Sequence, residues 1–164
     1  MYPDKDDMFN CRDNFSTAEY ATELMRKGYM CSGSVVMAYA RAFGFEKELA
    51  ARISSGFAGG MAQGKTCGAV TGAVMVIGLK YGAGMVRDQY AKDLCFQMTQ
   101  EFFHRFESRR RTTECQQIHR LNHINPTDPE LSRKLRKSGI CYGVVQDAVG
   151  IIEELFHDED LQSA

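Results

Sequence analysis

Apolar residues recur at helical spacing along most of this 164-residue chain, and no stretch alternates convincingly between apolar and polar positions. The clearest pattern is an apolar residue at every fourth position between residues 86 and 106. It consists of Val86, Tyr90, Leu94, Met98, Phe102 and Phe106. These side chains share one face of a long amphipathic helix, which we expect to end near Glu107. Because a strand needs a period of two residues, the chain is predicted to be all-α, without a sheet.

Capping residues, glycines and prolines divide the rest of the chain into shorter helices. Ser16 and Glu19 have the spacing of a capping box, so a helix is expected to start there and to end at Gly28. Further helices are expected over 31–43, over 46–54, from about 66, from 112 or 113 to about 122, from 127, and over about 141–156. The last of them should bury Val144, Val145, Ala148, Ile151, Ile152 and Leu155.

Glycine is concentrated in the middle of the chain. Residues 56–64 read Gly-Phe-Ala-Gly-Gly-Met-Ala-Gln-Gly, which is too rich in glycine for a regular element and predicts a loop with unusual backbone angles. In the helix that follows, Gly68 and Gly72 belong to a small-residue face that allows a second helix to approach closely. The fold is therefore expected to be a single-domain multi-helix bundle with a glycine-rich central loop.

Length and charge narrow the class of protein. A chain of this length can bury one core, so we expect one all-helical domain over residues 15–158, with flexible segments at 1–14 and 159–164. Lysine and arginine number 20 against 21 aspartates and glutamates, which gives no reason to expect a nucleic-acid partner. The N-terminal residues lack the features of a signal peptide, and the longest apolar stretch, 67–79, is shorter than the roughly 20 residues that cross a bilayer. These features predict a cytoplasmic protein with no membrane partner.

The six cysteines are the main chemical feature of the sequence. Four of them fall near the expected start of a helix: Cys31, Cys67, Cys115 and Cys141. At a helix start, unpaired backbone N–H groups and the positive end of the helix dipole stabilise a thiolate, which prepares it for metal ligation or thiol chemistry. The alternative is that these cysteines simply pack as small apolar side chains. The sequence holds no C-x-x-C pair, so the spacing matches no local zinc or iron–sulfur signature.

The two remaining cysteines are not expected to join such a site. Cys95 lies within the long helix beside Leu94 and Met98, where an inert buried thiol is the expected role. Cys11 lies in the N-terminal segment, where it is either an exchangeable thiol or without a role.

A phosphate-loop pattern competes with the cysteines. Gly59, Gly64, Lys65 and Thr66 satisfy G-x-x-x-x-G-K-[ST], and a helix is expected to follow them. The pattern requires a buried strand before it, whereas the preceding residues are typical of a helix. Nucleotide hydrolysis is therefore disfavoured.

Histidines and arginines supply two further candidates. Cys115, His119 and His123 have i, i+4, i+8 spacing and would line one face as metal ligands if their helix extends that far. Arg109 to Arg111 follow the long helix, where a solvated helix end is favoured and docking of an acidic redox partner is the alternative. The other histidines, His104 and His157, are expected to be ordinary surface residues.

Three segments resemble the C_GCAxxG_C_C family, whose members are assigned a redox role. They are Gly28 to Val35 (GYMCSGSV), Ser55 to Met61 (SGFAGGM) and Cys67 to Gly82 (CGAVTGAVMVIGLKYG), and the similarity extends over about residues 18–156. The family pattern carries over onto Cys31, Cys67, Gly68, Ala69, Gly72, Cys115 and Cys141. The central block reads Cys-Gly-Ala where the family name has Gly-Cys-Ala.

The resemblance implies a redox domain that holds an iron–sulfur cluster, most simply 2Fe-2S, through these four cysteines. We expect an electron-transfer protein with a redox partner protein, rather than a classical enzyme, with Gly64, Gly68 and Gly72 beside the cofactor, where N–H groups donate to sulfur. Related domains occur in split-Soret cytochromes, but the sequence has no C-x-x-C-H motif, so covalent c-type haem is not expected. A metal-free thiol–disulfide protein and a helical interaction module are the alternatives, and the oligomeric state stays open, a homodimer included.

Overall fold

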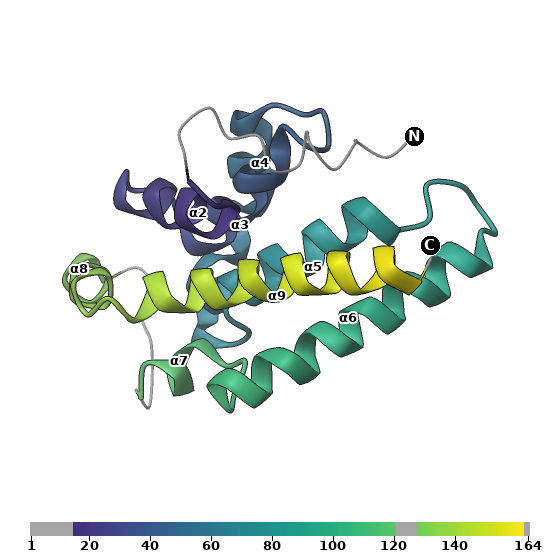
Figure 1. Ribbon diagram of the computed structural model, residues 1–164. Coiled ribbons are helices and arrows are strands. Elements are labelled where there is room, and N and C mark those ends of the chain that lie inside the picture. Colours follow the sequence, from purple (N-terminus) through teal and green to yellow (C-terminus); the bar gives the residue numbers. More distant parts are fainter. Residues whose placement is uncertain (1–14, 121–127, 163–164) are drawn as a thin grey trace.

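The computed structural model describes residues 15–120 and 128–162, and it is built from helices (Figure 1). Their bounds are α2 (Thr17–Arg26), α3 (Cys31–Ala40), α4 (Lys47–Ser54), η1 (Ser55–Phe57), η2 (Gly60–Gly64), α5 (Gly68–Tyr81), α6 (Gln89–Arg110), α7 (Cys115–Ile118), α8 (Pro129–Lys137) and α9 (Ile140–Gln162). Over the described residues no sheet forms, and the β-type pairing found there is a single isolated bridge between Thr66 and Glu114. The prediction of an all-α fold is confirmed.

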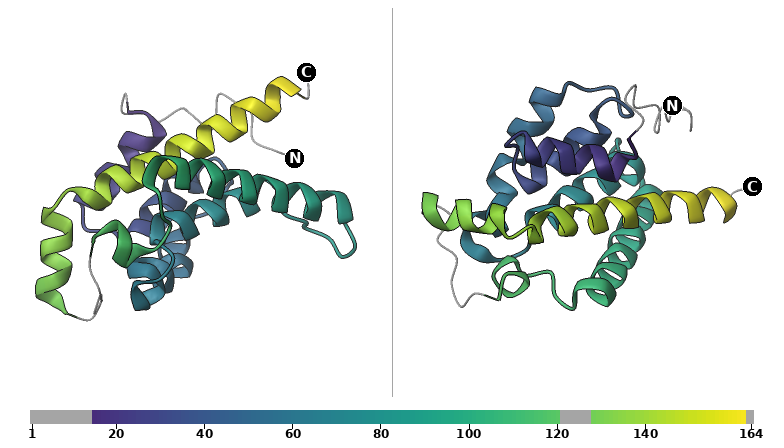
Figure 2. Two further views of the ribbon diagram at one scale, coloured as in Figure 1. Left: turned by 90° about the horizontal axis from the view of Figure 1, so that it is seen from below. Right: turned by 60° about the vertical axis from the view of Figure 1, so that its left-hand side comes forward.

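Helices α3 and α5 form the centre of the bundle. They pack directly on each other, α4 packs on α3, and α9 packs against α2, α5 and α6 (Figures 1 and 2). Gly72 allows the close approach of α3 and α5, because a Cβ at this position would lie 2.8 Å from the carbonyl oxygen of Ser32 and 3.1 Å from Cβ of Val35. The small-residue face expected on α5 therefore meets α3.

Aromatic rings join the three helices that carry most of the core. Phe156 of α9 makes edge-to-face contacts with Tyr39 of α3 and Tyr81 of α5, at centroid distances of 6.1 Å and 5.7 Å. All three side chains are buried. The apolar residues predicted to be buried on the last helix are also buried: Val144, Val145, Ala148, Ile151, Ile152 and Leu155. These contacts form one continuous core through α3, α5, α6 and α9.

Local capping signals account for several helix starts. The hydroxyl of Ser16 accepts a hydrogen bond from the N–H of Glu19, whose carboxylate accepts one from the N–H of Ser16, so the predicted capping box is confirmed. Asp88 accepts from the N–H of Ala91 and begins α6. Asp128 caps α8 in the same way, by accepting from two backbone N–H groups.

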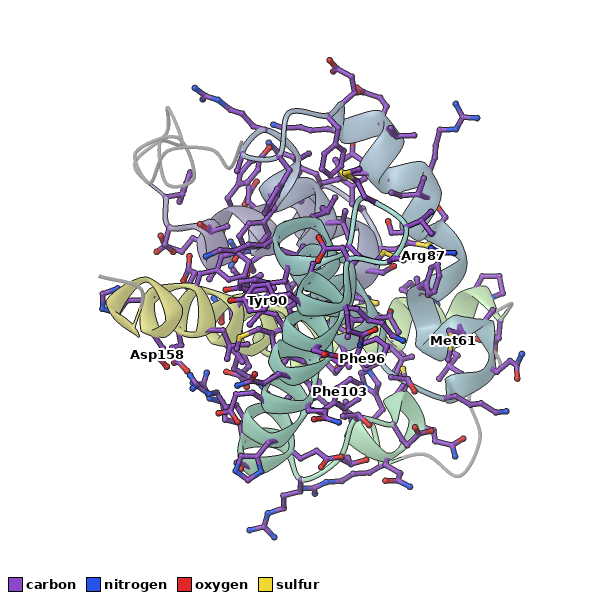
Figure 3. The ribbon with its side chains drawn as sticks, turned by 90° about the vertical axis from the view of Figure 1, so that its right-hand side faces the viewer. Met61, Arg87, Tyr90, Phe96, Phe103 and Asp158 are labelled. Atoms are coloured by element: carbon purple, nitrogen blue, oxygen red, sulfur yellow. The ribbon has the colours of Figure 1, made fainter. Side chains whose placement is uncertain are left out.

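Helix α6 differs from the expected helix in its first half. It begins at Gln89 and not at Val86, and it ends at Arg110. Val86 and Tyr90 are 92% and 78% exposed, while Phe102 and Phe106 are fully buried. Figure 2 shows why these two side chains are exposed: the α5–α6 connection projects from the body of the molecule. Figure 3 shows Tyr90 and Phe96 on this part of α6. The repeat of four correctly identified the helix, but only Phe102 and Phe106 of the repeat are fully buried, while Leu94 and Met98 pack on the core partly exposed.

The helices around residue 120 also differ from expectation. Helix α7 ends at Ile118, because Arg120 adopts a left-handed backbone conformation with φ of 56°, so it does not reach Asn122. The expected helix start at Thr127 lies outside the described residues. Helix α9 extends to Gln162, into the segment where a tail was expected to begin at residue 159. Within the described part of the chain, no helix combines the length and the apolar character needed to cross a membrane.

Candidate redox site

Four cysteines lie at helix starts, as the sequence predicted. Cys31 and Cys115 are the first residues of α3 and α7, Cys141 is the second residue of α9, and Cys67 is the N-cap of α5, one position before its first turn. Burial raises the pKa of the Cys67 thiol well above its ordinary value, and the charges of Cys31, Cys115 and Cys141 raise it further. Because such interactions weaken with distance, these four residues, here called the cysteine site, lie near enough to one another for their charges to act on Cys67.

A short bridge joins the segments that carry Cys67 and Cys115. The N–H of Cys67 donates to the carbonyl of Thr113 at 2.8 Å, and the N–H of Cys115 donates to the carbonyl of Lys65 at 2.7 Å. Thr66 and Glu114 pair between these two bonds. The start of α5 is therefore fixed against the start of α7, although the two are far apart in the sequence. A pairing of single residues gives no period-two pattern, so the sequence did not reveal it.

The glycine-rich segment closes over this bridge. Its unusual backbone angles are confirmed, since Gly59, Gly60, Met61, Ala62 and Gly64 all have positive φ, although the segment forms the irregular turns η1 and η2 and not a plain loop. A Cβ at Gly60 would lie 2.5 Å from the backbone nitrogen of Lys65 and 2.9 Å from Cβ of Cys115. Only glycine fits here, because both the space and the φ of 65° exclude a side chain.

Gly68 makes the closest contact with a sulfur atom. A Cβ at this position would lie 2.4 Å from Sγ of Cys31, so this sulfur rests directly against the backbone of α5. Of the other two glycines expected beside a cofactor, Gly72 meets the backbone of α3 at Ser32, and Gly64 is buried with a φ of 71°. Gly72 is therefore a helix-packing residue in this structure.

The thiols are more strongly buried than the sequence suggested. Burial raises the pKa of Cys31, although backbone hydrogen bonds from Gly59, Ser32 and Gly68 act in the opposite direction. Burial, followed by the charges of Cys31 and Glu114, raises the pKa of Cys115 to about 12. The expectation that helix starts would lower these pKa values is corrected: the N–H groups do favour the thiolate, but desolvation outweighs them.

His119 belongs to the cysteine site, but not as expected. The sequence placed it on one helix face with Cys115 and His123, whereas the helix ends at Ile118 and His123 lies outside the described residues. Instead, Nε2 of His119 lies 3.3 Å from Sγ of Cys141. Burial lowers the pKa of His119, and its Nδ1 is buried without a hydrogen-bond partner among the described residues. The contact spans 22 residues, so spacing could not reveal it.

The remaining candidates lie apart from the cysteine site or outside the described chain. Cys95 is half-buried and packs against the core from α6, in keeping with an inert thiol, and Cys11 lies outside the described residues. The phosphate-loop pattern contains η2 and follows the helix α4 and the turn η1, not a strand, so it lacks the structure that nucleotide binding requires. Arg109 and Arg110 pair with Glu154 and Asp147 of α9, so they serve helix packing.

Cys31, Cys67, Cys95 and Cys115 are free thiols. In the same part of the chain, no group of three or more histidine, cysteine, aspartate or glutamate side chains is arranged so that it could hold a metal ion. A two-iron cluster differs from a single ion, because it divides its cysteine ligands between two metal atoms. Around Cys31, backbone N–H groups point at the sulfur and Gly68 places no side chain against it.

Residues 29–155 match the family described as "Putative redox-active protein (C_GCAxxG_C_C)". The chain belongs to this family. No curated protein and no solved structure matches it. When Ala69 and Gly72 are aligned with the A and the final G of the family pattern, Gly68 occupies the position of the pattern cysteine and Cys67 that of the preceding glycine. In this member of the family, the residue beside Cys31 is therefore Gly68, which has no side chain. The cysteine of this segment is Cys67, the N-cap residue of α5, one position earlier.

Proposed function

We propose that the cysteine site binds an iron–sulfur cluster, most simply 2Fe-2S, and that the protein transfers electrons in the cytoplasm. The observation that supports the proposal is that Cys31, Cys67, Cys115 and Cys141 lie at four separate helix starts, near enough for the charges of the other three to act on Cys67. Backbone N–H groups of Gly59 and Gly68 at Cys31 would stabilise the negative charge of bound thiolates. When bound, such a group supplies one-electron oxidation and reduction, while the protein excludes water and fixes the four sulfurs.

Burial favours this proposal over thiol–disulfide exchange. Exchange requires a thiolate, and the raised pKa values of Cys31, Cys67 and Cys115 keep these thiols protonated at neutral pH when no metal ion is bound. Iron offsets the negative charge of the thiolates, so burial that hinders exchange does not hinder ligation. A helical interaction module would not require these cysteines to lie near one another.

The test is iron and acid-labile sulfide content, with the visible spectrum, of protein purified without oxygen. We expect coloured protein, and we expect Cys31→Ser, Cys67→Ser, Cys115→Ser and Cys141→Ser each to lose most of the iron, because serine keeps the volume but is a much poorer ligand. Cys95→Ser is the matched control and should keep it. Colourless protein that resists reconstitution contradicts the cluster proposal, and a reversible disulfide in such protein would establish the thiol alternative.

A further inference from the structure

The surface around the cysteine site is basic, although the chain as a whole is nearly neutral. An exposed cation precedes each of the four cysteines by two or four positions: Lys27, Lys65, Arg111 and Lys137. Within four residues of the cysteines, the sequence contains only one acidic residue, Glu114. Although the net charge of the chain is −1, the residues near the four cysteines therefore carry an excess of positive charge.

Several arginines elsewhere in the protein form ion pairs. Arg105, Arg109 and Arg110 form ion pairs with α6 or α9 carboxylates. Arg26 and Arg133 pair with a glutamate three positions away in their own helices. Among the described residues, no ion pair involves any of the four cations that precede the cysteines, so their charge faces solvent. The N-termini of α3, α5 and α9 add positive dipole ends at the same place.

Exposed apolar side chains lie beside the same sulfurs. Met30 directly precedes Cys31 and is 56% exposed. Phe57 and Met61 are each 36% exposed on the glycine-rich segment, and Figure 3 shows Met61 at its surface. The carbonyl oxygen of Phe57 is close to Gly68, which contacts Cys31. Apolar contacts surrounded by charges are typical of transient protein interfaces, in which the charges steer the encounter.

We propose that this basic face, defined by Lys27, Lys65, Arg111 and Lys137 around Met30, Phe57 and Met61, is the docking surface for an acidic one-electron carrier protein. Its charge complements an acidic partner, and its apolar residues lie next to Cys31 and to the glycines that contact Cys31 and Cys115. The inference deepens the proposed function and rests on it. It differs from docking at Arg109 to Arg111, because Arg109 and Arg110 are held by α9.

The experiment measures binding of the holoprotein to immobilised flavodoxin, an acidic carrier that contains no iron. Wild-type protein should bind at about 20 mM salt and lose most of its affinity at about 300 mM, because salt screens exposed charges. Lys65→Glu with Lys137→Glu should weaken binding by about tenfold. The matched control is Arg87→Glu with Lys92→Glu, which changes the net charge equally on the α5–α6 connection and the start of α6 and should leave affinity within about twofold.

The proposal is overturned if wild-type protein does not bind at low salt, or if both double variants weaken binding equally, which would show an effect of net charge alone. It is also overturned if single-stranded RNA or vesicles of phosphatidylglycerol bind more tightly than flavodoxin and compete with it. Iron content of the same samples separates the two proposals. Iron without flavodoxin binding rejects the docking surface only, and binding to this face without iron rejects the cluster only.

Discussion

The contact between Gly68 and Cys31 is the tightest one in the cysteine site. Alanine at position 68 would place Cβ 2.4 Å from Sγ of Cys31 and 3.1 Å from Cα of Ala58, so the sulfur or the backbone must move. We expect Gly68→Ala to lower the free energy of unfolding by about 1–3 kcal/mol and to lose most of the bound iron. Chemical denaturation and iron analysis measure the two effects.

Gly78→Ala is the matched control, because Gly78 lies in the same helix and an added Cβ there meets nothing within 4 Å. It should raise the free energy of unfolding by about 0.5–1 kcal/mol, since alanine favours the helix. Equal iron content and equal stability in the two variants would show that the contact between Gly68 and Cys31 has no role.

The sequence predicted that four cysteines lie at helix starts, but not what surrounds them. Capping residues and glycines mark helix starts, so the positions of Cys31 and Cys141 could be predicted from local signals. The pairing of Cys141 with His119 depends on a left-handed turn at Arg120 and on the packing of α7 near α9, which no local spacing encodes. The pKa values depend on burial, which is a property of the folded chain.

The bridge between the starts of α5 and α7 depends on the turn η2. Gly60→Ala would place Cβ 2.5 Å from the nitrogen of Lys65, and alanine is strained at a φ of 65°. We therefore expect Gly60→Ala to open the bridge, so that the amide hydrogens of Cys67 and Cys115 exchange at least about tenfold faster. Hydrogen exchange followed by NMR measures this directly, with Gly56→Ala as the control, because an added Cβ at Gly56 meets nothing. Unchanged exchange at both amides would contradict this role of Gly60.

The contact between α2 and α9 contains a carboxyl group that opposes folding at neutral pH. Burial raises the pKa of Glu153, the charge of Glu154 adds to the effect, and the side chain of Thr17 opposes it. Since the folded pKa lies above the unfolded one, the cost is present at neutral pH and disappears as pH falls through the folded pKa. Glu153→Gln should raise the melting temperature by roughly 2 °C at pH 7, with no gain below the ordinary value of 4.5.

Glu154→Gln is the comparison for this prediction. Glu154 is exposed and pairs with Arg109 at 2.5 Å, so its neutralisation loses this pair, which offsets the relief of its charge on Glu153, and should bring a smaller gain than Glu153→Gln at pH 7. A gain for Glu153→Gln that persists at low pH would show that charge is not its cause.

Periodicity predicted most helices because each buries a stripe on the same core. It failed where a helix leaves the core, as the start of α6 does at Tyr90, because an apolar repeat does not say which part of a helix has a neighbour. It also failed for α7, whose length is set by one backbone angle at Arg120. Tertiary packing and turn geometry decided these cases.

Over the whole molecule, the same helices serve the cysteine site at one end and the aromatic core at the other. Helix α5 has Cys67 before its first residue and Tyr81 as its last, and α9 has Cys141 near its start and Phe156 well towards its end. At 1.5 Å per residue, each pair is separated by roughly 20 Å along its helix. The core around Phe156 therefore does not need the cysteine site to pack.

Removal of the proposed cluster should consequently lower stability without unfolding the protein. A cluster that binds the folded state stabilises it by mass action, so we expect the metal-free protein to melt several degrees lower and to keep its helical circular dichroism. Faster hydrogen exchange should be confined to 57–67 and 113–119, while the residues around Tyr81 and Phe156 stay protected. Loss of the helical signal on iron removal would show that the metal, and not the aromatic core, organises the fold. An unchanged melting temperature would show that the four helix starts are held in place without it.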